Sequence, residues 1–244
     1  MNIYMIYSAK EQIAKNSKLL CGIHSYVAHG NTVMSEKLPS DLCGNIMVIS
    51  AQNAGEHISP AVYDECRKRK FTSVFLDAEE PCENNIRAFC EISESLSRRG
   101  LRVFCPIAFE EFCPQAIPVA DTCISGGVLS EYLKSLIVGR KRLALSLPRM
   151  CASFPMPPED SCGNALSPRE LSRLRDMHDA EVFFSPAMLL NYFIYSPSPR
   201  DAGFVLFDDG HTVTEKLRLA KKLGVSDVFL RYCELSDIAD DIWF

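Results

Sequence analysis

The sequence has 244 residues, of which 47% are hydrophobic and 23% charged, and its formal net charge is −5. This composition is that of an ordinary globular protein. The densest basic run, Arg67–Lys70, is short, so we expect no nucleic-acid partner. The length suits one (β/α)8 barrel, for which about 250 residues are typical, and it also leaves room for two small domains.

The eleven cysteines indicate a reducing compartment rather than a disulfide framework. Their number is odd, no Cys-x-x-Cys pair occurs, and Cys105, Cys123 and Cys233 lie in apolar runs, where free cysteine packs as a small hydrophobe. No basic segment followed by an apolar one opens the chain, and no apolar run approaches the roughly 18 residues of a membrane span. We therefore expect a cytoplasmic protein without membrane insertion.

Apolar runs alternate with helix-like runs along most of the chain. A helix start is predicted at Ser59, which precedes a proline, and capping boxes are predicted at Ser167–Glu170 and Thr212–Glu215. Gly100 and Gly224 end two helices immediately before strands. The predicted strands are Ile3–Tyr7, Asn45–Ser50, Ser73–Asp77, Arg102–Ala108, Thr122–Ser125, Arg142–Leu147, Val182–Ser185, Phe204–Phe207 and Asp227–Arg231.

Repeated helix–glycine–strand units imply parallel strands joined by crossover helices, so the predicted fold class is α/β. We expect one (β/α)8 TIM barrel domain over residues 1–244, with an inserted excursion over about 148–207. Residues 182–207 predict a small hairpin inserted before the last βα unit, because strand-like runs flank a Pro-Ser-Pro segment. The second barrel strand should lie within Leu19–Cys43, where the pattern does not place it.

The segment Phe71–Glu80 (FTSVFLDAEE) predicts a short buried strand that ends in acids. Side chains alternate along a strand, so Asp77 and Glu79 are expected to point the same way, opposite to Glu80. A barrel places its chemistry at this end of its strands. On the segment alone, a functional pair and a solvated strand end are equally good interpretations.

The last third of the chain carries a family resemblance. Asn191–Tyr195, Gly203–Asp209, Thr212–Lys222 and Gly224–Arg231 follow one another as a tyrosine-rich strand, a phenylalanine–acid–Asp turn, a Lys-rich helix and a final strand. This order resembles the carboxyl-terminal end of the family 18 chitinase-like glycoside hydrolases, in particular the branch that acts on spore and peptidoglycan glycans. Two further segments match: Leu96–Val103, and Arg142–Pro148 as the seventh strand. The resemblance extends over about residues 45–235.

The family signature Asp-x-x-Asp-x-Asp-x-Glu falls on Thr72–Glu79, which keeps its last two acids. The resemblance implies that Glu79 protonates the glycosidic oxygen while the substrate's own 2-acetamido group attacks the anomeric carbon. It implies that Asp77 orients that group and stabilises the oxazolinium intermediate. No cofactor is implied. Thr72 and Phe75 stand where the family has its first two acids.

Three further places depart from the family. The sixth strand lacks the usual Met-x-Tyr-Asp, since the equivalent stretch is Asp121–Gly127, and the third strand ends in Ser50–Asn53, which includes Gln52, instead of small glycine-rich residues. The eighth strand has Arg231, followed by Tyr232, where the family presents a tryptophan that stacks on the sugar. The sequence thus predicts a divergent member with lost or altered catalysis, and the enzyme assignment stays open.

Several other residues are candidates for binding. Glu110 follows the fifth strand and is expected at the barrel mouth, although a solvated loop is the more common place for such an acid. Arg231 is expected to pair with Glu79, Asp77 or Glu110, or to bind a ligand carboxylate or phosphate. Tyr192 is expected mainly in the hairpin core and otherwise in the cleft. The five histidines show no ligand spacing, so no metal site is predicted.

Three functions remain in competition. The first is binding, and hydrolysis if the acid works, of an N-acetylglucosamine-containing glycan. The second is a catalytically degenerate barrel that binds glycans or acts as a scaffold, in a spore or envelope context. The third is a barrel that takes a small anionic ligand through Arg231. The oligomeric state is not predicted.

Overall fold

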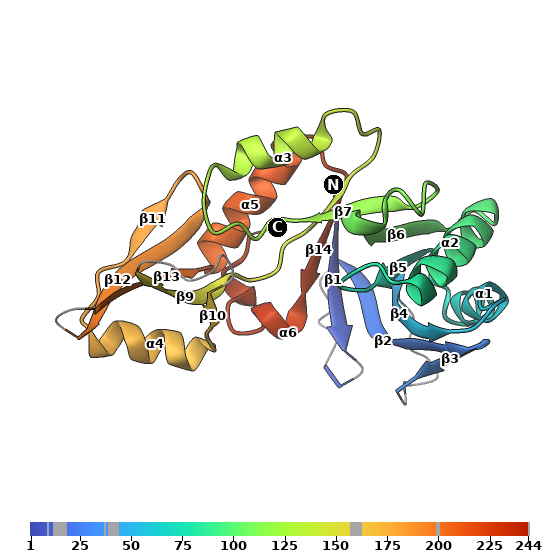
Figure 1. The fold of residues 1–244 in the computed structure, drawn as a ribbon, viewed down its shortest axis with the longest axis horizontal. Coiled ribbons are helices and arrows are strands. Elements are labelled where there is room, and N and C mark those ends of the chain that lie inside the picture. The colour runs from blue at the N-terminus through green and yellow to red at the C-terminus, as the bar shows by residue number, and fades with distance from the viewer. Residues whose placement is uncertain are drawn as a thin grey trace. The chain divides into compact units, whose positions relative to one another are not determined.

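Eight of the strand-forming runs join in one parallel barrel (Figure 1). The computed structural model describes residues 1–8, 10–11, 19–36, 38, 44–156, 163–198 and 201–243. The barrel closes because β1 pairs with both β14 and β2. In chain order the barrel strands are β1 (Asn2–Ser8), β2 (Leu20–Gly30), β4 (Ile46–Ala54), β5 (Ser73–Asp77), β6 (Arg102–Pro106), β7 (Ile117–Asp121), β8 (Ala144–Ser146) and β14 (Asp227–Arg231). The predicted TIM-barrel fold is therefore confirmed.

The chain divides into two compact units. Unit 1 contains the barrel and consists of Met1–Asp121, Gly139–Ser146 and Gly224–Cys233, and unit 2 consists of Thr122–Val138, Leu147–Leu223 and Glu234–Phe244. Unit 1 adds the helices α1 (Ser59–Arg69), α2 (Glu83–Arg98) and η1 (Ile107–Phe109), and the outer strand β3 (Thr32–Ser35). That the two units make up one domain, with an excursion over 148–207, stays a prediction.

The barrel interior is filled by aromatic and branched side chains. Phe229 lies at its centre, with ring centroids 4.9 Å from Tyr4, 5.0 Å from Phe75 and 5.0 Å from Phe104. The interior cluster comprises Tyr4, Ile6, Ile46, Val48, Phe75, Phe104, Ile117, Val119, Ala144 and Phe229. On the outside, the opposite faces of the strands pack against α1 and α2. This alternation makes the interior a packed core and leaves only its two ends for polar groups.

A buried carboxylate lies at the amino end of the barrel. Asp227, the first residue of β14, accepts hydrogen bonds from Arg102 at 2.9 and 2.5 Å, from Asn2 at 2.9 Å and from Ser226 at 2.6 Å. Burial raises the pKa of Asp227, but these hydrogen bonds and the charge of Arg102 lower it more, so the pKa lies below its ordinary value. The group therefore stays ionised and joins β1, β6 and β14.

Unit 2 is built on a five-stranded antiparallel sheet with the order β10-β9-β13-β12-β11. The predicted hairpin of residues 182–207 is present as β11 to β13, and the sheet continues beyond it. The strands are β9 (Cys151–Met156), β10 (Asn164–Ala165), β11 (Phe183–Ser185), β12 (Leu190–Ser198) and β13 (Asp201–Phe207). The helical elements of this part are α3 (Leu129–Ile137), α4 (Pro168–Met177), α5 (Gly210–Lys222), α6 (Tyr232–Leu235, at the boundary of the two units) and η2 (Ala239–Asp241).

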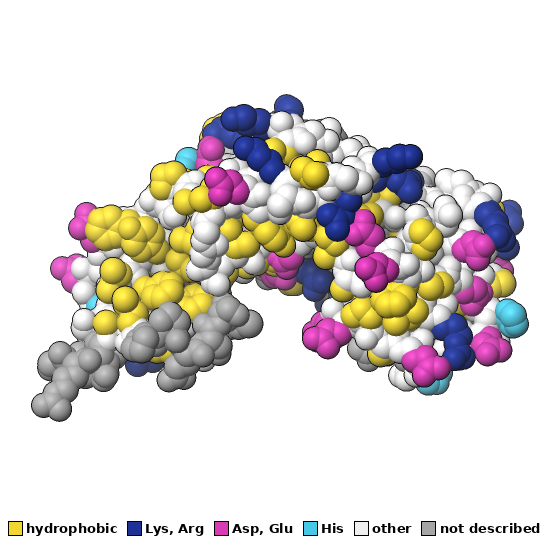
Figure 2. Space-filling model, turned by 45° about the horizontal axis from the view of Figure 1, so that its top comes forward, with side chains coloured by type: hydrophobic (Ala, Val, Ile, Leu, Met, Phe, Trp, Pro, Cys, Tyr) yellow, Lys and Arg dark blue, Asp and Glu magenta, His cyan; other side chains and the backbone are white. Residues whose placement is uncertain are grey.

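The two faces of this sheet bury different side chains. One face packs Phe193, Val205 and Phe207 against Leu171 and Leu174 of α4. The other face buries a second apolar cluster: Met150, Ala152, Phe154, Leu190 and Leu206. Large apolar side chains also remain exposed on unit 2, namely Met156, Met177, Val182, Phe183, Phe184 and Ile194. In Figure 2, hydrophobic side chains gather over the left part of the molecule.

The acidic pair that follows β13, Asp208 and Asp209, braces unit 2. Lys216 Nζ lies 2.8 Å from both carboxylate oxygens of Asp208, and Thr212 Oγ1 and the backbone N–H of Met150 donate to the same carboxylate at 2.7 and 2.8 Å. Asp209 caps α5 by accepting from the backbone N–H of Thr212 at 2.9 Å. Asn191 Nδ2 donates to the other carboxylate oxygen of Asp209 at 2.7 Å, so the carboxylate oxygens of both residues are used within unit 2.

Some predicted boundaries are wrong. The strand expected at Thr122–Ser125 is Ile117–Asp121 instead, where Pro118 stands near the strand start, a position that tolerates proline. The capping box predicted at Thr212–Glu215 lies three residues earlier, because Asp209 is the cap and Gly210 opens the helix. The box at Ser167–Glu170 is confirmed. Gly100 and Gly224 follow the ends of α2 and α5 as predicted, and both adopt the left-handed conformation.

Nine cysteines belong to the described part of the chain, and all nine are free. Cys105 is buried as expected, Cys123 is half-buried, and Cys233 is exposed, contrary to the expectation. Burial raises the pKa of Cys66 to about 12 and that of Cys21 to about 11. These two thiols therefore stay protonated and act as small hydrophobic side chains.

Candidate functional site

The carboxyl end of the barrel carries a layer of side chains that are polar except for Pro106. Each member stands two residues beyond an inward-facing residue of the strand, so the alternation of the strand turns it to the interior as well. Asp77 follows Phe75 in this way, and Arg231 follows Phe229. The layer consists of Ser8, His24, Ser50, Asp77, Pro106, Asp121, Ser146 and Arg231.

Asp77 is held from two sides by cationic or cation-forming groups. Arg231 Nη2 donates to Oδ1 of Asp77 at 3.3 Å, and His24 Nε2 lies 3.3 Å from Oδ2. The Asp77 side chain is 21% exposed, and the side chains of Arg231 and His24 are 40% and 38% exposed. Water therefore reaches all three groups, and each contact is long. Such a half-exposed ion pair contributes between zero and about 1 kcal/mol to stability, so it is free to exchange partners.

The sequence offered three acids as partners of Arg231, and the partner in the structure is Asp77. Glu79, by contrast, lies outside strand β5, which ends at Asp77. The alternation that should turn Glu79 to the same side as Asp77 does not extend to it, because residues 79–80 form a bend. Among the described residues, Glu79 is exposed and makes no hydrogen bond or ion pair. Its role as acid, and that of Asp77 as helper, stay predictions.

Glu110 is not brought to Asp77. Its carboxylate accepts from Arg140 Nε at 2.9 Å and lies 2.8 Å from Arg140 Nη2. Arg140 precedes β8, so the pair lies at the amino end of the barrel, in a cavity of about 330 Å³ that Pro118, Lys141 and Arg142 also line. The hydrogen bond and charge of Glu110 raise the pKa of Arg140 above its ordinary value. Glu110 thus serves an ion pair on the end of the barrel away from Asp77.

The remaining predicted site residues lie in three different places. Tyr232 directly follows Arg231, and its ring packs on Tyr7 with a centroid distance of 5.0 Å. Gln52 belongs to β4, and its side chain lies outside the described part of the structure. Tyr192 belongs to unit 2, where it packs on the cluster around Phe154, with its ring 5.6 Å from Phe183. Core packing of Tyr192 is therefore confirmed.

His24 is the member of the candidate site that the sequence reasoning missed. It lies in β2, the strand that could not be placed in advance. Strand alternation could have located it, because Leu20, Gly22 and His24 lie on one side of β2. Gly22 is so tightly packed in the barrel interior that a Cβ there would meet Ile6 Cδ1 at 2.2 Å. A histidine two residues beyond such a glycine points into the barrel mouth.

The chain resembles solved structures in its fold alone. A family 18 N-acetylglucosaminidase from Paenibacillus barengoltzii is similar over 99% of this chain and 98% of its own, with a TM-score of 0.63 and 11% identity. The spore cortex-lytic enzyme of Bacillus megaterium matches over 99% of this chain and 74% of its own, with a TM-score of 0.60 and 14% identity. The fold is that of the family 18 glycoside hydrolases. No protein-family model matches the sequence, and no curated protein sequence does.

A third structure of this fold is the family 18 chitinase from Cycas revoluta in complex with (GlcNAc)3, similar over 99% of this chain and 97% of its own at 13% identity and a TM-score of 0.59. Within the family 18 fold, β5 is the fourth barrel strand, β7 the sixth and β14 the eighth. The expected strands of Asp77 and Arg231 are thereby confirmed. Strand β7, Ile117–Asp121, contains no tyrosine.

Within the described ranges, no group of three or more His, Cys, Asp or Glu side chains is placed to hold a metal ion. The helices that the structure describes include none long and apolar enough to cross a membrane. Basic and acidic side chains both occur across the face drawn in Figure 2.

Proposed function

We propose that this protein binds an N-acetylglucosamine-containing glycan at the carboxyl end of the barrel. The observation that carries the proposal is the half-exposed group of Asp77, Arg231 and His24 on the floor of the mouth. Sugar hydroxyls both donate and accept hydrogen bonds, so a carboxylate beside a guanidinium and an imidazole matches them. Barrels of this kind place their sites at this end. The likeness to a chitinase structure with bound (GlcNAc)3 supports the choice of ligand.

Binding, rather than turnover, is the function that this arrangement favours. Stabilising a positive oxazolinium requires an Asp77 carboxylate whose charge is available. Arg231 already lies 3.3 Å from that carboxylate and opposes a second positive charge beside it. The sequence also offers no tyrosine in β7 and no tryptophan in β14 to hold the sugar for reaction. The site therefore keeps groups that bind hydroxyls and lacks groups that organise the reaction.

Hydrolysis at the same site is the second candidate. The observation in its favour is Glu79, which is exposed two residues beyond Asp77 and has no partner among the described residues. In this mechanism Glu79 gives its proton to the glycosidic oxygen as the bond to the anomeric carbon breaks. The acetamido oxygen of the substrate forms the new bond to that carbon. Water then attacks the same carbon, the bond to the acetamido oxygen breaks, and the Glu79 carboxylate takes the proton of the water. No cofactor takes part.

Calorimetric titration with chitotetraose tests the proposal. The Glu79→Gln variant is titrated so that hydrolysis cannot consume the ligand, and we expect saturable binding. Adding Arg231→Ala to that variant should weaken binding tenfold or more, because about 1.4 kcal/mol per tenfold is the scale of one charged hydrogen bond. Glu110→Gln is the matched control, since its carboxylate lies at the other barrel end, and it should bind as before. Absence of binding by the Glu79→Gln variant would refute the proposal.

A fluorogenic chito-oligosaccharide separates binding from turnover. Equal, background-level release by wild type and Glu79→Gln is the expected result, and release that depends on Glu79 would establish the second candidate instead. If chitotetraose does not bind, a thermal-shift series with sugar phosphates and carboxylates tests the anionic ligand of Arg231.

Location in the cytoplasm, or association with a spore or envelope, is part of this proposal, and the similarity to a spore cortex-lytic enzyme supports the association with a spore.

A further inference from the structure

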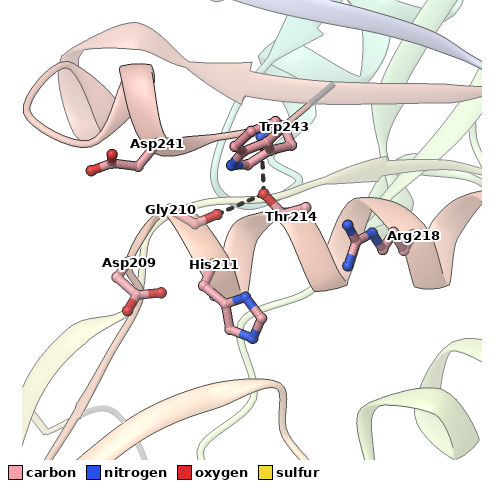
Figure 3. A pocket seen from close by; sticks show the side chains of 7 residues that line it. All are labelled: Asp209, Gly210, His211, Thr214, Arg218, Asp241 and Trp243. Carbon is pink, nitrogen blue, oxygen red and sulfur yellow. Dashed lines mark hydrogen bonds between the residues drawn. The ribbon is translucent and has the colours of Figure 1, made fainter.

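Unit 2 contains a cavity of about 580 Å³ that belongs to no predicted site. Its size falls within the roughly 300–1,000 Å³ typical of small-molecule sites. Two parts of unit 2 supply its walls: helix α5 with its cap residue Asp209, and the end of η2 with the segment that follows it (Figure 3). The lining residues are Asp209, Gly210, His211, Thr214, Arg218, Asp241 and Trp243.

The local sequence explains how the cavity forms. His211, Thr214 and Arg218 are spaced three and four residues apart, so they share one face of α5. The backbone N–H of Trp243 donates to Thr214 Oγ1 at 3.0 Å, and that hydroxyl donates to the Gly210 carbonyl at 2.7 Å (Figure 3). These two bonds fix the carboxyl-terminal segment beside the helix.

Gly210 allows the approach of this segment. A Cβ at position 210 would lie 2.4 Å from Cβ of Asp241 and 2.8 Å from its carbonyl carbon, distances that no real side chain accepts. The absence of a side chain at Gly210 therefore brings Asp241 close to the start of α5. Trp243 follows two residues later, and 78% of its surface is exposed.

The cavity offers a flat apolar surface beside separate donors and acceptors. Trp243 is the only tryptophan of the sequence, and a large exposed indole is the kind of surface that proteins use for binding. Among the described residues, the Asp241 carboxylate has no hydrogen-bond partner. Arg218 pairs with Glu215, which leaves most of its five N–H groups for a ligand. His211 contacts the Phe184 ring and can donate or accept.

The charges of the cavity argue against an ion as ligand. Two carboxylates, Asp209 and Asp241, oppose the entry of a phosphate or sulfate, and Asp209 already caps the helix by accepting from Thr212. The Arg218 guanidinium opposes an ammonium group in the same way. A neutral ligand that carries both donors and acceptors satisfies all of these groups.

We propose that this cavity binds a neutral saccharide ring, whose apolar C–H face packs on Trp243 while its hydroxyls donate to Asp241 and accept from Arg218 and His211. Ring hydroxyls supply donors and acceptors together, and the ring face supplies the apolar area that the indole needs. This site is separate from the one proposed in the barrel and does not depend on it. It would let the protein contact a glycan through unit 2 as well.

The fluorescence of Trp243 reports on this site directly, because the chain has no other tryptophan. Chitotriose, cellotriose and maltotriose are titrated separately into the full chain. We expect at least one of them to give a saturable shift of the emission to shorter wavelength, since a sugar ring on the indole excludes water. No saturable change with any of the three would overturn the proposal. A saturable response to glucose 6-phosphate or choline alone would overturn it as well.

Three variants locate the response. Asp241→Asn and Arg218→Ala should each weaken it tenfold or more, and both side chains are exposed, so folding is preserved and is checked by circular dichroism. Arg173→Ala is the matched control, since this cation of unit 2 does not line the cavity, and its titration should equal that of wild type. Unchanged affinity in both cavity variants would overturn the assignment.

The Asp77→Asn variant tests whether the fluorescence change comes from binding in the barrel. This variant should keep the full fluorescence response even though calorimetry shows weaker binding of chitotetraose in the barrel. Loss of the response in Asp77→Asn would assign the signal to the barrel and refute the second site. Failure of barrel binding with an intact fluorescence response would refute only the proposed function of the barrel.

Discussion

Each unit holds one aspartate against a cation at the end of a strand, and the two pairs differ in their exposure to water. In unit 2, Asp208 and Lys216 are 1% and 2% exposed, and Lys216 Nζ lies 2.8 Å from both carboxylate oxygens. In the barrel, Asp77 contacts Arg231 and His24 at 3.3 Å, and all three side chains are partly exposed. Similar residue types thus form a buried ion pair with short contacts in unit 2 and a solvent-accessible group with longer contacts in the barrel.

The difference separates a structural pair from a binding group. A buried pair is stable only when its remaining hydrogen-bond acceptors are satisfied, and Thr212 and the Met150 backbone satisfy Asp208. No ligand can compete for such a carboxylate. Asp77 has long contacts and access to water, so replacing Arg231 or water by a ligand hydroxyl costs little. The second arrangement is the one expected of a site.

Removing the buried carboxylate should have the largest effect on stability. Asp208→Ala leaves the Lys216 ammonium unpaired inside unit 2 and frees the Thr212 hydroxyl and the Met150 N–H. We expect a loss of about 3–5 kcal/mol in the free energy of unfolding. Urea denaturation followed by circular dichroism measures this loss. A loss below 1 kcal/mol would show that the pair is not buried in solution.

A double variant provides the control for that measurement. Asp208→Leu combined with Lys216→Met removes both charges and replaces them with apolar side chains. Because the desolvation penalty of the pair disappears with the pair, the double variant should be markedly more stable than Asp208→Ala. Equal stability of the two would mean that the lost hydrogen bonds of Thr212 and Met150, rather than the stranded ammonium, account for the effect.

The fold was predictable to the extent that patterns are local. The strands Ser73–Asp77 and Asp227–Arg231 agree with the structure to the residue, because each is a short apolar run between a helix end and a charged stop. Strand β2 could not be placed, since it is long, carries His24 and a bulge, and lacks a preceding helix signal. The sequence did not predict the full sheet of unit 2, because its edge strand β10 has only two residues and leaves no periodic pattern.

The candidate site was predictable in part. Strand alternation and the position of the strand end placed Asp77 and Arg231 correctly, and Asp77 is one of the three acids that the sequence offered as a partner for Arg231. The partner His24 depends on register between β1, β2 and β4, which no local pattern contains. Glu110 was misplaced for the same kind of reason: after β6 the chain turns back through η1, so an acid that follows a strand end reaches the opposite end of the barrel.

The pair of Asp227 and Arg102 is intermediate between the buried pair of unit 2 and the exposed group of the barrel mouth, since Asp227 is buried while Arg102 is 40% exposed. Its pKa is lowered in the folded protein, so its contribution to stability is present above the unfolded pKa of about 4 and is lost as the pH falls through the lower folded value. Asp227→Asn should cost about 2 kcal/mol at pH 7, because exposed Arg102 remains hydrated. Urea denaturation at pH 7, 4 and 3 should show the difference between variant and wild type shrinking with acid. A difference that stays constant would contradict this.

Asp77→Asn should have the smallest effect on stability and a clear effect on binding. Its contacts to Arg231 and His24 are long and half-exposed, so the free energy of unfolding should change by less than about 1 kcal/mol. Chitotetraose binding should weaken tenfold or more, because the amide cannot accept from sugar hydroxyls with the strength of a carboxylate. His24→Gln, which retains a polar side chain, should bind more tightly than Asp77→Asn. A large loss of stability in Asp77→Asn would make this aspartate a brace like Asp208, and the contrast between the two units would fail.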